Sequence, residues 1–264
     1  MIKLIAADLD GTLLDDRKEV SPEFWPLYER LRSQGILFAV ASGRQYYNLA
    51  DEFSRIASDL LIIAENGAYA KRGNEEVFVN AMDFSAVIDC VKAARELDGA
   101  YAVVCGKRSA WAEDRDDAFL RETRRYYREF RLVDDLTLVD DEILKVSVCD
   151  FTHAEVVSYP FFKSRLGHCT VTLGGSQWVD IANPTANKGS ALQKVGAHFA
   201  IGSEEMMAFG DYLNDREMLQ EAYHSFAMKN AHPEVKQVAR YVIPFDNNEE
   251  GVVRTIKRFI FQEN

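Results

Sequence analysis

The sequence predicts an α/β fold, in which a parallel sheet covered by helices is interrupted by an inserted α+β domain. Two observations lead to this prediction. Short, wholly apolar strands alternate with helices at both ends of the chain, as in parallel sheets that are buried on both faces. The pattern changes near residue 82 and returns after Ile181. We therefore expect a core domain of residues 1–82 and 183–264 and an inserted domain of residues 83–182.

The N-terminal part of the core contains three apolar strands that alternate with helices. The strands are expected at residues 3–7 (KLIAA), 36–41 (ILFAVA) and 60–64 (LLIIA). Between them, apolar side chains recur at helical spacing over residues 22–33 and again through Leu49 and Phe53. Strand, helix, strand, helix, strand is the order of a parallel sheet covered by helices.

The inserted domain has strands that alternate more between polar and apolar residues. Its helices are expected at residues 86–97 and 116–130, and its strands at 101–105, 109–113, 145–150 and 169–173. The alternation in residues 145–150 (KVSVCD) predicts a sheet with one exposed face. Pro160 is expected to start or kink a helix between the last two strands.

The apolar pattern of the core returns in the last third of the chain. Helices are expected at residues 189–199, 215–222 and 252–261, and strands at residues 206–209, 225–228 and 241–242. One domain interrupted by another is the simplest account of this order.

The composition, with 264 residues, 47% hydrophobic and 28% charged, is that of a globular protein of one large or two modest domains. The net charge of −11 disfavours nucleic acid and anionic membranes as partners, since both attract basic surfaces. No apolar run approaches the roughly 20 residues of a membrane span. The first residues include aspartates where a signal peptide would be apolar, and the four cysteines lack metal-binding spacing. We expect a cytoplasmic protein, either a monomer or a small homo-oligomer.

The first functional motif is Asp8-Leu9-Asp10-Gly11-Thr12, directly after the first strand. The carboxylates of Asp8 and Asp10 can converge on one cation only if the chain turns, and Gly11 permits that turn. Oxygen ligands without His or Cys suit magnesium. An Asp-rich surface turn is the alternative, but the preceding strand and the following Gly-Thr favour a functional site.

Two further segments indicate an anion-binding site. Ser42-Gly43-Arg44 follows the second strand, and Lys188 opens a helix. A hydroxyl, a glycine amide and a helix N-terminus together can bind an anion, although Ser-Gly by itself is more often a simple helix cap. A lysine at a helix N-terminus is usually solvated. Because a cation is disfavoured there, a concentrated negative charge near Lys188 would offset the cost.

Asp211, Asn214 and Asp215 lie in the segment GDYLND, which follows the strand at residues 206–209. Carboxylates and an amide beside a turn glycine indicate further metal and phosphate ligands. Asp215 could instead cap the next helix. Three of the four motifs thus follow the C-terminal ends of predicted parallel strands, the edge at which open α/β sheets bind ligands.

The motifs D-x-D-G-T, S-G-R, Lys188 and G-D-x-x-N-D, in this order, resemble those of the haloacid dehalogenase (HAD) superfamily. Other segments resemble its Cof-type subfamily (IIB, with a C2 cap): AENGA at 64–68, FAMKNA at 226–231 and NNEEGV at 247–252. The stretch ASGRQYYNL at 41–49 and the pair Arg240-Tyr241 look most like the bacterial sugar-phosphatase and FMN-phosphatase branch. The resemblance implies a Rossmann-like catalytic core and an inserted α/β cap that sets substrate specificity.

The resemblance also implies a magnesium-dependent phosphatase that forms an aspartyl-phosphate. Asp8 would be the nucleophile, and Asp10 would act as acid and then as base, which requires Asp10 to be protonated when substrate arrives. Mg²⁺ would be held by Asp8, the backbone carbonyl of Asp10 and Asp211, with Asp215 and Thr12 supporting them. The residues implied to bind the phosphoryl group are Leu9, Ser42, Gly43, Arg44, Lys188 and Asn214.

The substrate implied by the resemblance is a small phosphorylated metabolite, with sugar phosphates preferred and FMN or another cofactor phosphate as further choices. Residues that could recognise the substrate are Arg44, Gln45, Tyr46, Trp111 and Trp178. Each of them could equally be a packing residue or a surface residue. Two other functions stay open. One is transfer of the phosphoryl group back to a sugar, as in phosphosugar mutases, and the other is ligand binding without catalysis on the same fold.

Overall fold

The computed structural model describes residues 1–263, and the chain forms two compact units. The core unit consists of residues 1–43, 50–78 and the chain from Asn187 onward. The inserted unit consists of residues 44–49 and 79–186, and so contains the whole predicted insertion. The short segment 44–49, which the sequence placed in the core, packs with the inserted unit.

The core unit is built on an eight-stranded sheet in the order β14-β13-β12-β1-β2-β3-β4-β5. Its strands are β1 Leu4–Ala7, β2 Leu37–Ala41, β3 Leu61–Ala64, β4 Tyr69–Arg72, β5 Glu75–Val79, β12 Met206–Gly210, β13 His224–Ala227 and β14 Tyr241–Val242. The strands from β14 to β3 pair in parallel, and β4 runs antiparallel to β3. This confirms the predicted α/β class with a parallel-sheet core.

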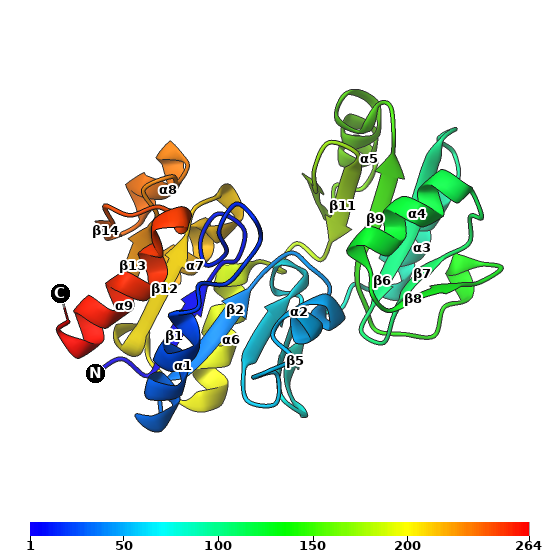
Figure 1. Ribbon diagram of the computed structural model, residues 1–264. Helices are drawn as coiled ribbons and strands as arrows, with labels where there is room; N and C mark the ends of the chain where they lie inside the picture. Colours follow the sequence, from blue (N-terminus) through cyan, green and yellow to red (C-terminus); the bar gives the residue numbers. More distant parts are fainter. Residues whose placement is uncertain (264) are drawn as a thin grey trace. The chain divides into compact units, whose positions relative to one another are not determined.

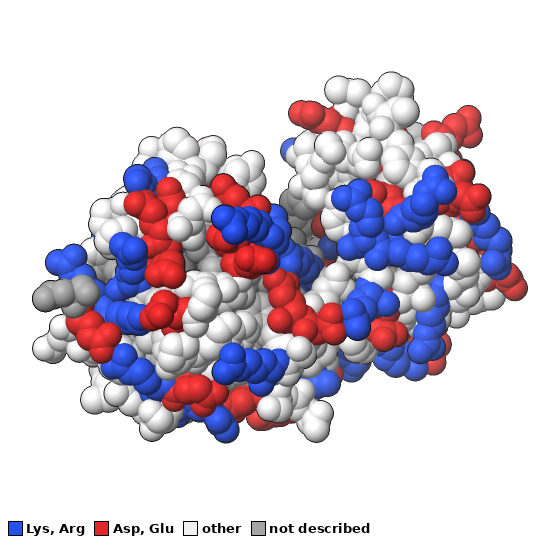
Figure 2. All heavy atoms as spheres, viewed as in Figure 1, with Lys and Arg blue, Asp and Glu red and all other residues white. Residues whose placement is uncertain are grey.

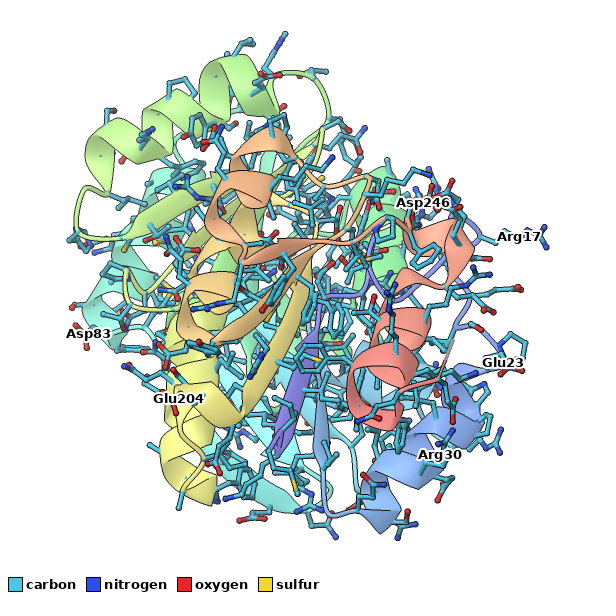
Figure 3. The ribbon with its side chains drawn as sticks, turned by 90° about the vertical axis from the view of Figure 1, so that its left-hand side faces the viewer. Arg17, Glu23, Arg30, Asp83, Glu204 and Asp246 are labelled. Carbon is cyan, nitrogen blue, oxygen red and sulfur yellow. The ribbon has the colours of Figure 1, made fainter. Side chains whose placement is uncertain are left out.

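Helices cover both faces of this sheet (Figures 1 and 3). They are α1 Phe24–Ser33, α6 Lys188–Phe199, α7 Arg216–Glu221, α8 Pro233–Val238 and α9 Gly251–Phe261. The short helix α2 Tyr46–Glu52 begins in the inserted unit and ends in the core unit. α1 packs against β2 and α9, while α6 packs against α7 on the other face. Glu23 and Arg30 at α1 point away from the sheet, as Figure 3 shows, and pair with Lys257 and Glu263. Exposed ion pairs of this kind contribute little stability, so burial of the apolar residues holds the helices in place.

The central strands are apolar because helices exclude water from both of their faces. β1, β3 and β12 are buried at every residue, and β2 at every residue except Leu37. Polar side chains that could bind a ligand therefore begin only where a strand ends.

The inserted unit contains a six-stranded sheet in the order β10-β11-β9-β6-β7-β8, antiparallel except for the parallel pair β7–β8. Its elements are α3 Phe84–Ala94, β6 Ala100–Gly106, β7 Ala110–Ala112, α4 Asp117–Tyr126, β8 Phe130–Leu132, β9 Ile143–Asp150, α5 Tyr159–Arg165, β10 Thr170–Leu173 and β11 Trp178–Ala182. One apolar cluster joins the sheet to α3 and α5, and a second includes Phe119 of α4. Pro160 lies in the first turn of α5, as predicted.

Some predictions for the elements were wrong or incomplete. β9 is buried at every residue, so this strand has no exposed face. Its Lys145 and Ser147 hydrogen-bond to Asp180 on β11, which allows polar residues to be buried there. The helix expected to reach Phe130 ends at Tyr126, because the chain becomes extended at Tyr127 and enters β8. The sequence did not predict β4, β5 or the six-residue helix α8.

Candidate active site

Three of the motifs meet at one edge of the core sheet. Asp8, Ser42 and Asp211 directly follow β1, β2 and β12, which are neighbours in the sheet and run in parallel. The carboxyl ends of such strands lie at the same edge, so the motifs converge because of the topology. The backbone N–H of Asp8 donates to the carbonyl of Phe209 on β12, at 3.1 Å, which holds the first motif against that strand.

Lys188 lies between two of the carboxylates. Its Nζ is 2.5 Å from Asp8 Oδ1 and 2.6 Å from Asp215 Oδ1. Lys188 and Asp215 are fully buried, and Asp8 is 7% exposed. Lys188 is the first residue of α6, and the side chain of Asn187 caps this helix by accepting the N–H of Ser190 at 2.8 Å. The two carboxylates supply the negative charge expected beside a lysine at a helix N-terminus.

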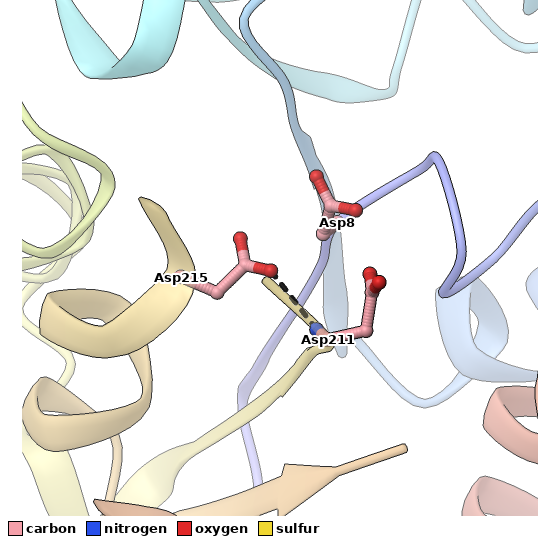
Figure 4. A group of neighbouring side chains, drawn as sticks. All are labelled: Asp8, Asp211 and Asp215. Atoms are coloured by element: carbon pink, nitrogen blue, oxygen red, sulfur yellow. Dashed lines mark hydrogen bonds between the residues drawn. The ribbon is translucent and has the colours of Figure 1, made fainter. Parts of the chain in front are cut away.

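Asp211 and Asp215 are held by a small hydrogen-bond network. Asp215 Oδ2 accepts the backbone N–H groups of Asp211 and Tyr212, each at 3.0 Å. Figure 4 shows the first of these two bonds. Thr12 Oγ1 donates to Asp211 Oδ1 at 2.7 Å. Asp215 also occupies the N-cap position of α7, as the alternative expected, but its side chain makes no cap bond to that helix.

Gly11 allows the first motif to approach Asp211. Its φ is +84°, and a Cβ at this position would lie 2.5 Å from Asp211 Oδ2. Any other residue would combine an unfavourable backbone conformation with a clash against the carboxylate. The turn glycine of the motif therefore serves both the turn and the close contact.

Burial and charge shift the pKa values of this cluster. Burial, and then the Asp215 carboxylate, raise the pKa of Asp8 from 3.8 to about 8, although Lys188 opposes the shift. Burial also raises the pKa of Asp211 to about 6, against the hydrogen bond from Thr12. Burial alone would lower the pKa of Lys188, but the carboxylates of Asp215 and Asp8 outweigh it and raise this pKa above its usual range. Lys188 is therefore positively charged.

The carboxylates of Asp8, Asp211 and Asp215 could hold a metal ion. They each offer an oxygen, and these oxygens lie within 4.8 Å of one another (Figure 4). When ionised, the three carboxylates and Lys188 sum to −3 + 1 = −2, a charge that one divalent cation would balance. Oxygen donors without His or Cys fit a hard cation.

Two of the predicted phosphate-binding residues, Ser42 and Asn214, are joined through Asn66. The backbone N–H of Asn66 donates to the carbonyl of Ser42 at 3.0 Å, and its side-chain Oδ1 accepts from Asn214 Nδ2 at 3.1 Å. Gly43 lies directly against the Asn66 amide. The side chain of Leu9 is fully buried, so only its backbone could meet a ligand.

Two predicted site residues, Asp10 and Arg44, lie outside the cluster formed by Lys188 and the three carboxylates. The carboxylate of Asp10 is 41% exposed and pairs with Lys18 at 2.7 Å, so its side chain is outside the three-carboxylate group. Arg44 belongs to the inserted unit. Sequence reasoning assigned no role to Lys18 or Asn66. The dipeptide Asn66-Gly67 was a usable signal, because Asn-Gly favours a left-handed turn.

The inserted unit holds the segment that follows Ser42-Gly43. Gln45 Nε2 donates to the carbonyl of Glu129 at 2.9 Å, and Gln45 Oε1 accepts the N–H of Glu129 at 3.1 Å. Nearby residues line a groove of about 480 Å³: Arg124, Tyr127, Arg128, Phe130 and Leu132. Lys and Arg side chains of this unit are exposed on the face shown in Figure 2. Trp178 is buried against Tyr126 and Tyr127, as a packing residue would be.

Among residues 1–263, no helix is long and apolar enough to cross a membrane.

The known proteins that are similar to this chain are hydrolases and phosphatases. The family model for haloacid dehalogenase-like hydrolases matches residues 5–256. The chain is 33% identical to the 5-amino-6-(5-phospho-D-ribitylamino)uracil phosphatase YbjI of Escherichia coli, over 99% of this chain and 97% of that protein. It is 28% identical to YitU of Bacillus subtilis, a phosphatase of the same name, over 97% of each chain.

A solved structure shows the same fold. A HAD subclass IIB sugar phosphatase superposes with a TM-score of 0.79 at 22% identity, over 97% of this chain and 98% of that one. The match covers both units of the chain, and the family match spans the four sequence motifs of the site. The chain therefore belongs to the haloacid dehalogenase-like hydrolases, in their Cof-type subfamily, and is a phosphoric monoester hydrolase.

Proposed function

We propose that this phosphatase uses Mg²⁺ to hydrolyse small phosphorylated metabolites through an aspartyl-phosphate on Asp8. The observation that carries the proposal is the buried cluster in which Lys188 bridges Asp8 and Asp215 beside Asp211. Residues 1–82 and 183–264 would be the catalytic core, and residues 83–182 the specificity cap.

The proposed reaction has two displacements at phosphorus. A carboxylate oxygen of Asp8 attacks the phosphoryl group, the bond from phosphorus to the alcohol oxygen breaks, and Asp10 gives its proton to the leaving alcohol. A water then attacks the aspartyl-phosphate and gives a proton to Asp10, which releases inorganic phosphate and restores both aspartates. Lys188 holds Asp8 Oδ1 at 2.5 Å, which orients the carboxylate for this attack.

Asp10 would change partners during the reaction. Its carboxylate accepts a hydrogen bond from Lys18 at 2.7 Å, an ion pair of the ionised form. The acid role requires a protonated Asp10. We therefore infer that Asp10 leaves Lys18 as substrate binds and carries the proton that the reaction needs at that point.

Phosphoryl transfer depends mostly on positioning and on charge stabilisation. The phosphoryl oxygens would be contacted by the hydroxyl of Ser42, the ammonium group of Lys188 and the amide of Asn214. The remaining proposed ligands are the backbone groups of Leu9, Gly43 and Arg44. The uncatalysed hydrolysis of phosphate monoesters is among the slowest reactions that enzymes accelerate, by up to about 10²¹-fold. Several groups must therefore act together.

Mg²⁺ would be held by Asp8, Asp211 and the backbone carbonyl of Asp10. When bound, it supplies positive charge that neutralises the phosphoryl oxygens. Asp215 would position Lys188 and, through its bonds to the N–H groups of Asp211 and Tyr212, the loop that carries Asp211. Thr12 would fix the rotamer of Asp211 through its 2.7 Å hydrogen bond.

Among substrates, we propose a phosphorylated sugar or sugar alcohol, with 5-amino-6-(5-phospho-D-ribitylamino)uracil as the first compound to test. Two relatives that match nearly the whole chain carry that name. This compound joins a phosphorylated ribityl chain to a pyrimidine, so it unites the sugar-phosphate and flavin-like features expected from the sequence. FMN and simple sugar phosphates are the comparison compounds.

The test is release of inorganic phosphate from these compounds and from p-nitrophenyl phosphate, with Mg²⁺ and with EDTA. We expect turnover that EDTA abolishes, and the highest kcat/KM with the ribityl compound. Turnover that requires a sugar bisphosphate would indicate a mutase instead. Binding of a phosphorylated compound without release of phosphate would indicate a ligand-binding protein.

A further inference from the structure

The turn that follows β3 has an unusual backbone. Glu65, Asn66 and Gly67 have φ values of +51°, +52° and +93°, three left-handed residues in succession. Residues other than glycine rarely adopt this region, although asparagine does so more readily than most. Glu65 and Gly67 are buried, so the turn is enclosed by its surroundings. Such conformations persist where neighbouring structure determines them, and they are frequent at functional sites.

Asn66 contacts two of the loops that would bind the phosphoryl group. Its backbone N–H donates to the carbonyl of Ser42 at 3.0 Å, and its Oδ1 accepts from Asn214 Nδ2 at 3.1 Å. Its amide also packs against Gly43, where a Cβ would lie 2.9 Å from Asn66 Nδ2. One residue thus joins the loop after β2 to the loop after β12.

Gly67 brings the same turn against a third loop. A Cβ on Gly67 would collide with the carbonyl of Asn187, the residue that caps α6 and precedes Lys188. The positive φ of Gly67 and this close approach both exclude a side chain. The turn therefore touches the three loops that carry Ser42, Asn214 and Lys188.

We propose that Asn66 is a positioning residue for phosphoryl transfer, because it holds the amide of Asn214 and the Ser42 loop in register with each other. This rests on the proposed function, since it concerns the same phosphoryl group. An amide NH₂ has two N–H groups. Asn66 accepts one from Asn214 and thereby directs the other toward the phosphoryl site. Asn214 is exposed, so without Asn66 its side chain would be free to turn.

Asn66→Gly removes the side-chain amide and keeps the backbone, because glycine adopts a left-handed φ readily. We expect the melting temperature to stay near that of the wild type, and kcat/KM for p-nitrophenyl phosphate with Mg²⁺ to fall about 10–100-fold. Ala200→Gly is the matched control for glycine at a left-handed position, since Ala200 has φ +54° and ends α6. We expect this variant to keep wild-type kcat/KM.

A double-mutant cycle separates positioning from a general structural role. Asn214→Ala should lower kcat/KM strongly in the wild type and only slightly in the Asn66→Gly background, because Asn66 acts through Asn214. Asn66→Asp keeps the acceptor oxygen and tolerates the left-handed backbone. In that background, Asn214→Ala should regain its full effect.

Equal losses from Asn214→Ala in all three backgrounds would overturn the proposal, as would an unchanged kcat/KM in Asn66→Gly. The same double-mutant cycle can be measured without turnover, as the affinity for inorganic phosphate in the presence of Mg²⁺, determined by calorimetry. The outcomes of the two proposals are therefore distinct. A wild type that releases no phosphate refutes the proposed function, while the phosphate affinities of the variants still decide the role of Asn66.

Discussion

Lys188 in the core unit and Lys145 in the inserted unit are both buried against aspartate, and the two settings differ. In the core unit, Lys188 lies 2.5 Å from Asp8 and 2.6 Å from Asp215, at the start of a helix. In the inserted unit, Lys145 lies 3.1 Å from Asp180, within neighbouring strands of a sheet. The lysine of the core is fully buried and that of the inserted unit is 6% exposed.

The two clusters also differ in their balance of charge. Lys145 and Asp180 sum to zero, and Asp180 accepts a further hydrogen bond from Ser147 at 2.6 Å. When its three carboxylates are ionised, the core cluster keeps two negative charges after Lys188 is counted. The Lys145–Asp180 pair balances its own charge within the sheet, whereas the ionised carboxylates that follow β1 and β12 require positive charge from elsewhere. The imbalance therefore distinguishes a reactive site from a packed one.

Asp8→Asn tests the largest difference between the two clusters. An amide cannot form the aspartyl-phosphate, so phosphate release from p-nitrophenyl phosphate should fall by about 10⁴-fold or more. Asp180→Asn is the matched control, because it also removes a carboxylate beside a buried lysine, and its turnover should stay far above that of Asp8→Asn. Wild-type turnover in purified Asp8→Asn would assign the nucleophile to another residue.

Lys188→Met and Lys145→Met compare the two lysines in stability. Removal of Lys188 leaves two buried carboxylates without their partner, which should cost about 3–5 kcal/mol in the free energy of unfolding at pH 8. The loss should be smaller at pH 6, because the raised pKa of Asp8 lets it take up a proton. Lys145→Met should cost less at both pH values, since Asp180 can reach water. Urea denaturation measures the free energy of unfolding of both variants at both pH values. Equal losses for Lys188→Met and Lys145→Met would contradict the comparison.

The central strands of the core could be predicted from the sequence because their constraints are local. A strand buried on both faces must be apolar, so the polar residues Asp8, Ser42 and Asp211 mark the strand ends directly. The parallel order of the strands then brings these residues to one edge. The burial of Lys188 could not be predicted, since a lysine at a helix start is ordinarily solvated, and only the folded chain places two carboxylates around it.

The inserted unit was harder to predict because its polar residues are satisfied by partners that are distant in sequence. Lys145 and Ser147 suggested an exposed face, and their partner Asp180 comes more than 30 residues later. The role of Asn66 was missed for the same reason, because its contacts with Ser42 and Asn214 depend on the whole sheet. The periodicity of apolar residues in a sequence indicates which residues are buried, but it does not indicate which polar groups pair with one another.

Mg²⁺ binding should depend on pH in the core cluster. In the folded protein without the cation, the pKa is about 8 for Asp8 and about 6 for Asp211, so both are largely protonated at pH 5.5. Binding must then release protons, and the affinity for Mg²⁺ should rise from pH 5.5 and level off above about pH 8.5. Calorimetric titrations over this range measure the affinity and the protons released. An affinity independent of pH would contradict the proposed ligands.

The same shift in Asp8 predicts the stability of the protein without Mg²⁺. The pKa of Asp8 is raised from 3.8 to about 8 by folding, so the folded state binds a proton that the unfolded state lacks between these values. The contribution of Asp8 to stability is therefore full below pH 3.8 and is lost as the pH rises toward 8. Asp8→Asn should flatten this dependence in urea denaturation.

Gln45→Ala tests the smallest of these effects, within the inserted unit. Gln45 is 3% exposed, and its side chain pairs with both backbone groups of Glu129, at 2.9 and 3.1 Å. Alanine would leave the N–H of Glu129 to water, because Glu129 is exposed, while its carbonyl still accepts the N–H of Ala110 at 2.9 Å. The loss should therefore be about 1 kcal/mol. Hydrogen exchange should show faster exchange at Glu129, while amides beside Asp8 and Lys188 stay protected. Equal loss of protection in the core unit would mean that the two units do not unfold separately.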